Sequence, residues 1–309
     1  MLGVLHGFAL ILGLIGAGYL TALFGVVKGD QRLVLNNVAF FVATPALLFG
    51  VLHDSDPSVL FTPVIIITTL AAIIAAAVYV IASRLWFKRS LAETTLGATC
   101  AGYVNSNNLG LPVAVYILGD AAYVAPLLLV QLVLFSPAIL AILESTRGPG
   151  RSGLKGAWVA LGRAASNPII IASIGGFLFA VFGLQMPELV LAPIEMLGAA
   201  AIPMVLLSFG ISLYGQRALQ RGTGRLAVFT SSGIKLILMP VVAWALSIAL
   251  GLGPHETLVA TTIAALPTAQ NVYNYAATYR QGEVMVRDTV FLTTFVSLPV
   301  IALVAWLLG

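Results

Sequence analysis

Ten apolar stretches, each long enough to cross a bilayer, limit this chain of 309 residues to a narrow set of folds. A transmembrane helix needs about 20 residues, and only helices and closed barrels satisfy their backbone hydrogen bonds inside lipid. Continuous apolar stretches of this length predict helices. They fall at about 3–27, 33–53, 58–83, 92–118, 122–144, 166–184, 189–213, 225–250, 256–279 and 286–308, and are numbered here as predicted helices 1 to 10.

Composition agrees with a membrane protein. Hydrophobic residues make up 60% of the chain and charged residues only 8%, with a mean hydropathy of +1.05. No water-soluble domain covers its surface with so few charges. The first stretch lacks the basic start of a signal peptide, so it is expected to be a retained span. We therefore predict an all-α polytopic membrane protein with ten transmembrane helices.

The basic residues predict an orientation. All the loops between an odd-numbered helix and the next one contain Lys or Arg, whereas the other loops and both termini contain none. The positive-inside rule then predicts a multi-pass protein of the cell (plasma) membrane with both termini extracellular. The net charge of +4 is part of this topology signal and requires no nucleic-acid partner. The cations of the odd loops are Lys28, Arg32, Arg84, Lys88, Arg89, Arg147, Arg151, Lys155, Arg163, Arg217, Arg221, Arg225, Arg280 and Arg287.

An internal repeat relates the two halves of the chain. The sequence GYLTALFG at 18–25 resembles GFLFAVFG at 176–183, and PALL at 45–48 resembles PMVL at 203–206 at the same offset. Each repeat would hold five helices, and an odd number inverts one repeat relative to the other in the membrane. Chance matching between low-complexity apolar segments is the alternative. The predicted units are a first repeat at 1–144, a cytoplasmic linker at 145–165 and a second repeat at 166–309.

Predicted helix 4 is interrupted near its centre by the sequence NSNNLGLP at 105–112. Pro112 lacks the N–H of an interior helical residue, and it disfavours helical geometry at Leu111, while Gly110 permits whatever dihedral angles a break needs. We expect an unwound helix at this point. Irregular backbone at membrane depth persists only where it lines a protein-enclosed cavity, so the break predicts a binding site. A simple proline kink is the alternative.

Predicted helix 9, the repeat partner of helix 4, is interrupted as well, at Pro267. Two broken helices at matching positions of inverted repeats indicate a transporter. If they cross, the positive N-terminal ends of their second halves favour an anion, and amide side chains bind it without the desolvation cost of a full charge. The predicted substrate-binding residues are Asn105, Asn271, Asn108, Gln270, Asn107, Asn274 and Tyr275, with Gly110, Pro112 and Pro267 at the breaks.

Two charged residues fall inside predicted helices. Lys235 lies about ten residues into helix 8, near mid-membrane at about 1.5 Å per residue. Ionisable residues at this depth are functional by default, and snorkelling toward an interface is the alternative. Glu195 lies one to two turns inside the outer end of helix 7. Both are candidate coupling charges, although an outer-vestibule or interhelical contact is the stronger interpretation for Glu195.

The chain resembles a prokaryotic member of the auxin efflux carrier family. The resemblance rests on Leu35 to Asn37 and Pro45 to Phe49 in helix 2, on 105–112 in helix 4, and on 266–279 in helix 9. It implies ten helices in two inverted five-helix repeats, in the fold that sodium symporters of bile acids share. It also implies a scaffold domain of helices 1, 2, 6 and 7 and a transport domain of helices 3–5 and 8–10.

By the same resemblance, the protein exports organic anions by an elevator mechanism across the crossing of helices 4 and 9. Asn105 would contact the substrate, and Pro112 would lie at the first crossover. The plant carriers have a proline at the second crossover, where this chain has Val272. That departure leaves open both the crossing point and the substrate, which is either a small carboxylate or an auxin-like compound.

We therefore predict a secondary active transporter of a small organic anion. The alternative is a transporter-like sensor that binds a ligand without moving it. An enzyme is not expected, because no nucleophile and base pair up inside the membrane, and no phosphate-binding loop indicates ATP coupling. No cofactor or metal is predicted. Proton and sodium coupling both stay open, with sodium-independent transport favoured; the other expected partners are membrane lipids and a second copy in a homodimer.

Overall fold

The computed structural model describes residues 2–27, 31–55, 62–146, 162, 165–215 and 224–309, and these are helical for most of their length. Most of the predicted linker at 145–165 lies outside the described residues. The α-helices are α1 (Leu2–Leu23), α2 (Gln31–Val38), α3 (Thr44–Asp54), α4 (Pro63–Ala82), α5 (Leu91–Gly102), α6 (Leu111–Val113), α7 (Ala125–Val130), α8 (Ser136–Ser145), α10 (Pro168–Val181), α11 (Glu188–Leu213), α12 (Arg225–Gly233), α13 (Met239–Ala249), α14 (Pro254–Ala264), α15 (Asn271–Tyr279) and α16 (Glu283–Leu308).

Several of these helices continue into one another through wide or tight turns. The π-helical turns are η1 (Ala39–Ala43), η3 (Ser83–Phe87), η4 (Ser106–Gly110), η5 (Ala114–Leu118), η7 (Gln131–Phe135) and η8 (Ile234–Leu238), and η6 (Ala121–Tyr123) is a 3₁₀ turn. Among the described residues, 7 helical runs are long and apolar enough to cross a membrane. The helix α10 is shorter, and the regions of predicted helices 4 and 9 are interrupted. The protein is thus a polytopic membrane protein that is all-helical over the part of the chain that the structure describes.

Proline explains four of the π-helical turns. In each, the proline follows two residues after the turn, and the residue before it donates its N–H to a carbonyl five residues earlier, as Leu111 N does to Ser106 O. A proline ring clashes with the carbonyl four residues earlier, so a wider turn at this point keeps the helix continuous. The four prolines are Pro45 after η1, Pro112 after η4, Pro137 after η7 and Pro240 after η8.

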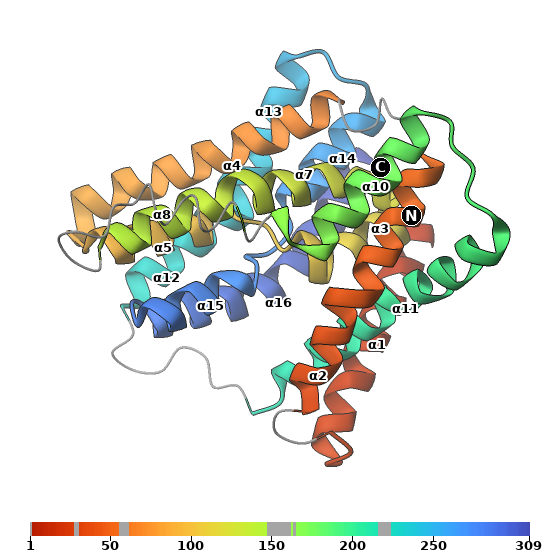
Figure 1. The fold of residues 1–309 in the computed structure, drawn as a ribbon. Coiled ribbons are helices and arrows are strands. Elements are labelled where there is room, and N and C mark those ends of the chain that lie inside the picture. Colours follow the sequence, from red (N-terminus) through yellow and green to blue (C-terminus); the bar gives the residue numbers. More distant parts are fainter. Residues whose placement is uncertain (1, 28–30, 56–61, 147–161, 163–164, 216–223) are drawn as a thin grey trace.

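The helices pack in two groups, which Figure 1 shows side by side. The first group, on the right of the view, consists of α1, α2, α3, α10 and α11, with close packing of α1 on α11 and of α10 on α3. In the second group α4 packs on α5, α13 and α14, and α16 packs on α12, α14 and α15. The described contacts between the groups include η5 with α1 and η4 with α11.

Glycine permits the closest contacts within the first group. A side chain at Gly18 of α1 would collide with the carbonyl oxygen of Leu207 in α11, and one at Gly176 of α10 with that of Phe49 in α3. Small residues of this kind let membrane helices approach backbone to backbone. The two contacts involve matching positions of the internal repeat. Gly18 corresponds in sequence to Gly176, and Phe49 corresponds to Leu207.

Candidate functional site

Two helical regions break at the same place in the structure. The helix α5 ends at Gly102, and the chain runs extended through Tyr103 and Val104 to Asn105 before the turn η4 begins. The helix α14 ends at Ala264, and α15 begins only at Asn271. Pro267 lies inside this second break, where its missing N–H and fixed φ oppose a continuous helix. Predicted helices 4 and 9 are therefore both interrupted, as the sequence indicated.

The two breaks pair with each other as a short antiparallel bridge. Asn105 N donates to Pro267 O (2.8 Å), and Ala269 N donates to Tyr103 O (3.2 Å), on either side of Val104 and Thr268. Each break thus supplies partners for the backbone groups that the other leaves without helical hydrogen bonds. Unpaired backbone groups at membrane depth cost several kcal/mol. This mutual pairing explains why two interruptions at one point are tolerated.

The first break lies seven residues before the predicted proline. Pro112 is in α6, and both Gly110 and Leu111 have ordinary right-handed helical angles (φ −64°, ψ −49° and φ −59°, ψ −50°). The predictions that Gly110 and Pro112 form the break and that Leu111 is extended are therefore wrong. The physical reason is the wide turn η4, which accommodates the proline ring within a helix. The actual break is formed by Tyr103 and Val104, whose backbone is extended, and by Asn105, which is not helical.

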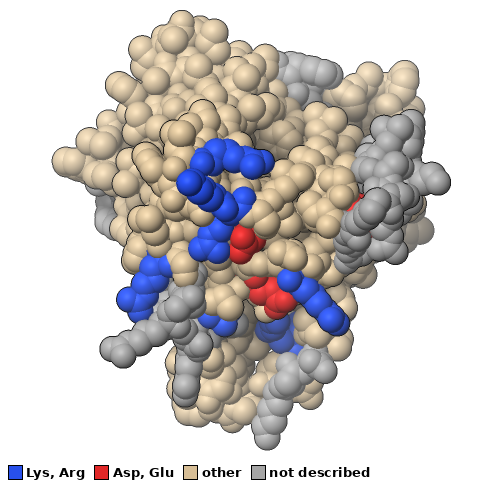
Figure 2. All heavy atoms as spheres, turned by 90° about the vertical axis from the view of Figure 1, so that its left-hand side faces the viewer, with Lys and Arg blue, Asp and Glu red and all other residues tan. Residues whose placement is uncertain are grey.

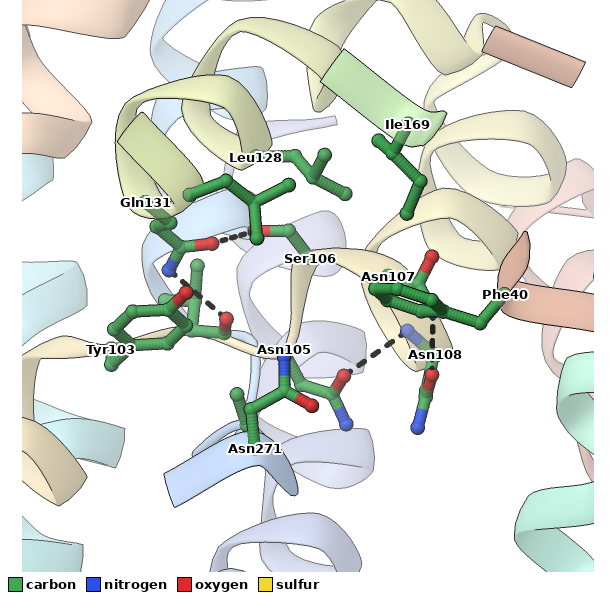
Figure 3. Close-up of a pocket in the computed structure, with 13 residues that line it drawn as sticks. Phe40, Tyr103, Asn105, Ser106, Asn107, Asn108, Leu128, Gln131, Ile169 and Asn271 are labelled. Atoms are coloured by element: carbon green, nitrogen blue, oxygen red, sulfur yellow. Dashed lines mark hydrogen bonds between the residues drawn. The ribbon is translucent and has the colours of Figure 1, made fainter. Parts of the chain in front are cut away.

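A cavity of about 30 Å³ lies beside this pairing, and we call it the inner cavity. Figure 3 shows its side chains, which come from both breaks and from three further parts of the chain. Its lining residues are Phe40, Tyr103, Val104, Asn105, Ser106, Asn107, Asn108, Leu128, Gln131, Leu132, Ile169, Ala269 and Asn271.

Asn105 presents a free donor at this cavity. Its side chain is buried, and its Oδ1 accepts a hydrogen bond from Asn108 N (3.1 Å), which fixes the orientation of the amide. The other atom of the amide, Nδ2, is buried and has no hydrogen-bond partner among the described residues. Asn271, in the first turn of α15, lines the same cavity (Figure 3). A buried amide N–H without a partner is costly unless a ligand or water completes it.

A chain of amide hydrogen bonds leads away from the inner cavity. Asn107 Nδ2 donates to Asn108 Oδ1 (2.8 Å), and Asn108 Nδ2 donates to Gln270 Oε1 (3.0 Å). Gln270 Nε2 then donates to Ser212 Oγ of α11 (3.4 Å). Three of the predicted amides therefore connect the two broken regions to each other and to the first helix group. Asn107 Oδ1 is buried without a partner among the described residues, so this chain is also incomplete.

Sequence reasoning missed Gln131. Its side chain, in η7, accepts a hydrogen bond from Ser106 Oγ (2.6 Å) and donates one to Val104 O (3.0 Å). It therefore holds the extended backbone on which Asn105 sits. A single amide in an otherwise apolar membrane segment, here between Val130 and Leu132, was the signal that could have found it.

A second, larger cavity of about 250 Å³ adjoins the inner cavity, and we call it the vestibule. It lies between α2 and α11 on one side and α15 and α16 on the other. The two cavities share four lining residues, which are Phe40, Asn107, Asn108 and Asn271. The rest of the vestibule lining is Arg32, Leu33, Asn36, Phe209, Ser212, Leu213, Gln270, Tyr273, Asn274, Arg287, Val290, Phe291 and Thr294.

Two arginines in the vestibule were also missed as site residues. Arg32 and Arg287 were interpreted only as loop cations that set the orientation, yet both line this cavity. Arg287 Nη2 and Nε donate to Asp288 Oδ1 (2.9 and 3.1 Å), and the Asp288 side chain is fully buried. Their place in the structure depends on how α2 and α16 approach each other, which no local pattern in the sequence reveals.

Lys235 lies beside the crossing and lines neither cavity. Its side chain is fully buried, and its ammonium donates to Met239 Sδ (2.9 Å) and to Ala264 O (3.4 Å). Complete burial excludes the alternative that Lys235 snorkels to an interface. Ala264 is the last residue of α14, so the ammonium meets the negative end of that helix dipole.

Three other predicted site residues lie elsewhere. Glu195 is exposed on α11 and lines neither cavity, so the structure gives no contact for its predicted coupling role. Tyr275 also lines neither cavity, and its hydroxyl donates to Ser136 Oγ (2.9 Å). Asn274 lines the vestibule and not the inner cavity, while Val272 is fully buried in the core. The predicted set is therefore divided between the two cavities, the protein interior and, for Glu195, the exposed surface of α11.

Basic side chains gather on one face of the molecule. Figure 2 shows Lys and Arg over the end of the second helix group, with a few acidic residues between them. The described cations at this end belong to three odd loops of the predicted topology: Lys88 and Arg89 precede α5, Arg225 begins α12, and Arg280 follows α15. Loops that the sequence assigned to one side of the membrane thus share one face.

Comparison with known proteins agrees with a transporter. The sequence profile of the family described as membrane transport protein matches residues 4–150 and 154–305. A protein of Rhizobium meliloti (strain 1021) named as a putative malonate transporter is 28% identical over 299 residues, covering 94% of this chain and 91% of the relative. An uncharacterised transporter of Methanocaldococcus jannaschii is 25% identical over 310 residues, covering 97% of each chain.

The family match extends over nearly the whole sequence. This chain therefore belongs to the membrane transport protein family, the auxin efflux carrier-like family that its motifs predicted, and is a membrane transporter and not an enzyme.

Proposed function

We propose that the protein is a secondary active transporter that exports a small organic anion by alternating access. The observation that carries this proposal is the pairing of the two breaks beside a cavity where Asn105 Nδ2 has no protein partner among the described residues. Discontinuous helices that meet inside a membrane protein and line a cavity are the usual site of substrate binding in transporters.

Three features of the cavities favour an anion. The turn η4 and the helix α15 both begin at the inner cavity, so the positive ends of two half-helices meet there. The amides of Asn105 and Asn271 add neutral donors. In the vestibule, the lining contains two arginines and no carboxylate. A cation would meet repulsion throughout this path, whereas a carboxylate would meet donors and positive charge.

The volumes favour a small substrate. A cavity of about 30 Å³ accommodates one or two groups of the size of water, since about 10–15 Å³ is needed for one such group. One carboxylate therefore fills the inner cavity, while the body of the substrate occupies the vestibule of about 250 Å³. The name of the Rhizobium relative suggests malonate as the first compound to test.

The internal contacts support ten transmembrane helices in two inverted repeats. The packing of Gly18 on Leu207 and of Gly176 on Phe49 is a reciprocal pair, as expected when two equivalent units are related by a pseudo-two-fold axis. The antiparallel pairing at Val104 and Thr268 has the same local symmetry, because each break donates one N–H to the other.

The two helix groups support an elevator mechanism. The group of α1, α2, α3, α10 and α11 corresponds to the scaffold domain implied by the family resemblance, and the second group to the transport domain. The vestibule lies between them, with α2 and α11 on one side and α15 and α16 on the other. In this proposal the second group, with the paired breaks, moves relative to the first and carries the anion across the membrane.

Lys235 would replace a coupling cation. Its buried ammonium binds Ala264 O at the end of α14, where a bound ion would otherwise neutralise the helix end. Sodium-independent transport is therefore proposed, with proton coupling as the remaining option. Transport measured in vesicles with and without sodium tests this directly, and a strict sodium requirement would contradict it.

The proposed orientation places the protein in the plasma membrane with both termini outside. Ser55 follows α3 and Gln281 lies between α15 and α16, on opposite sides in this topology. A cysteine at Ser55 should react with an impermeant thiol reagent in intact cells, and one at Gln281 only after permeabilisation. Cys100 is buried and provides a low background. External labelling at Gln281 would reverse the orientation.

The function itself is tested in proteoliposomes. Vesicles loaded with radiolabelled malonate, acetate or indole-3-acetate should release at least one of them through the wild-type protein, and Asn105→Ala should release it about tenfold more slowly at low concentration. A protein that binds one of these compounds without moving it would instead be the sensor that the sequence left as the alternative.

A further inference from the structure

The vestibule contains a pair of guanidinium groups that the crossing does not use. Arg287 lies one turn inside α16, and Arg32 lies in the first turn of α2. Because α2 and α16 are on opposite sides of the vestibule, the two arginines line it from opposite sides. One therefore belongs to each helix group. Ionisable side chains that face a cavity inside a membrane protein are candidates for a functional role.

Arg287 is held in place by Asp288 and still has donors to offer. Its Nε and Nη2 donate to Asp288 Oδ1 (3.1 and 2.9 Å), which uses two of the five N–H groups of a guanidinium. The side chain of Arg287 is 29% exposed, whereas that of Asp288 is 0% exposed. Arg287 therefore faces the vestibule, and its carboxylate partner lies behind it.

Arg32 has no such partner. No hydrogen bond or ion pair of its side chain occurs among the described residues, although it lines the same cavity as Arg287. A guanidinium suits bidentate recognition of a carboxylate better than an ammonium does. Two of them on facing walls, with amides from Asn36 and Asn274 nearby, make the vestibule a strong anion site.

We infer that Arg32 and Arg287 form an anion-capture site in the vestibule, distinct from the amide site of the inner cavity, and that Asp288 is the positioning counter-ion that limits its affinity. This inference rests on the proposed function, because it gives that substrate path a first binding step. A carboxylate would bind the free N–H groups of both arginines before it moves past Asn107 and Asn108 to Asn105.

The proposed role of Asp288 predicts that one of its variants binds an anion more tightly than wild type does. Its negative charge orients the guanidinium of Arg287 but also offsets part of its attraction for an anion. Asp288→Asn keeps an oxygen that accepts both hydrogen bonds from Arg287 and removes the opposing charge. The variant should therefore bind an anion several-fold more tightly. Asp288→Ala removes both the charge and the positioning, so it should lack this gain.

Loss of the arginines should weaken binding. Arg32→Gln should raise the half-saturating malonate concentration about tenfold, the effect of losing a charge-assisted hydrogen bond. Arg287→Gln alone leaves Asp288 as an unpaired buried charge and risks unfolding. The double variant Arg287→Gln with Asp288→Asn removes both charges, so it should fold and still bind malonate about tenfold more weakly.

The experiment titrates malonate and acetate against the detergent-purified full chain and follows thermal unfolding. The matched control is Arg84→Gln, which removes an exposed arginine that lines neither cavity, and it should bind like wild type. Increased affinity in Asp288→Asn with decreased affinity in Arg32→Gln supports the capture site. Unchanged affinity in either of these variants overturns it, as does a wild type that binds neither anion.

Transport separates this inference from the proposed function. If vesicles containing the wild type move malonate or acetate while Asp288→Asn and Arg32→Gln keep the wild-type affinity, the capture site is wrong and the transporter stands. If the variants change anion binding as expected but no compound is moved, the capture site stands and the transport proposal fails.

Discussion

The crossing of the two broken helices has two unlike sides. On the side of the inner cavity, Asn105 Nδ2 and Asn107 Oδ1 are buried without partners among the described residues. On the side away from both cavities, Thr268 Oγ1 donates to Cys100 O (2.7 Å), and the Lys235 ammonium donates to Ala264 O (3.4 Å). We call these the cavity side and the core side. The named groups beside the cavities therefore lack partners, whereas Thr268 and Lys235 on the other side of the same backbone pairing have them.

From this difference we expect that the cavity side serves ligand binding and that the core side serves stability. Native proteins pair nearly all buried polar atoms, so those left unpaired are expected where a ligand binds. On the core side, hydrogen bonds to backbone carbonyls hold two chain segments that have no helical partners of their own. Substitutions on the cavity side should then affect transport more than folding, and those on the core side should do the reverse.

The largest effect is expected from Asn105→Asp. The new carboxylate still accepts from Asn108 N, so thermal stability in detergent should change little. It loses the free donor and repels an anionic ligand, so transport at low substrate concentration should fall roughly a hundredfold. Asn37→Asp is the control, because Asn37 is exposed on α2 and lines neither cavity. If Asn105→Asp transports a carboxylate as well as wild type does, the ligand is not an anion or the site lies elsewhere.

Lys235→Met tests whether a residue of the core side also contributes to transport. Lys235 is on the core side, yet we expect it to supply the positive charge that a coupling ion would provide. Methionine fits the same volume without a buried charge, so folding should survive, whereas transport should fall roughly tenfold. Transport by wild type and variant is compared in sodium and in potassium. Normal transport by the variant would make Lys235 purely structural.

The sequence predicted the breaks better than it predicted their geometry. Pro267 does lie in the second break, because proline removes a backbone donor wherever it occurs. Pro112 was misleading for the same reason, since a π-helical turn can absorb a proline, and only the neighbouring chain decides between a turn and a break. The non-helical residues Tyr103 to Asn105 are stabilised by Pro267 O and by Gln131, which are remote in sequence.

The same limit applies to the site. Asn105 and Asn271 could be named because amides inside an apolar segment are unusual wherever they point. Arg32 and Arg287 looked like ordinary loop cations, and their convergence on the vestibule follows from the packing of helices far apart in the chain. Glu195 shows the opposite limit. It was a candidate coupling charge because it is an acidic residue inside an apolar stretch, yet its side chain is exposed on the surface of α11.

A smaller effect is expected from Gln131→Leu. This substitution leaves Val104 O and Ser106 Oγ without their present partner. We expect a loss of about 2 kcal/mol in stability, seen as a lower unfolding temperature in detergent, and a several-fold decrease in transport because the backbone of Asn105 loosens. Gln131→Glu keeps the acceptor for Ser106 Oγ but loses the donor to Val104 O. Its unfolding temperature and its transport should therefore lie between those of wild type and those of Gln131→Leu. A stable Gln131→Leu protein would show that the break does not depend on this side chain.

The smallest effect should come from Thr268→Val, which keeps the shape of the side chain and removes its hydroxyl. The hydroxyl donates only to Cys100 O, and the backbone N–H of Thr268 keeps its bond to Thr293 Oγ1 (3.2 Å). Loss of one buried hydrogen bond should lower stability by about 1 kcal/mol. Because Thr268 lines neither cavity, transport at saturating substrate should stay within about twofold of wild type. A large transport defect in a protein of normal stability would mean that the core side also takes part in transport, and the division between the two sides would fail.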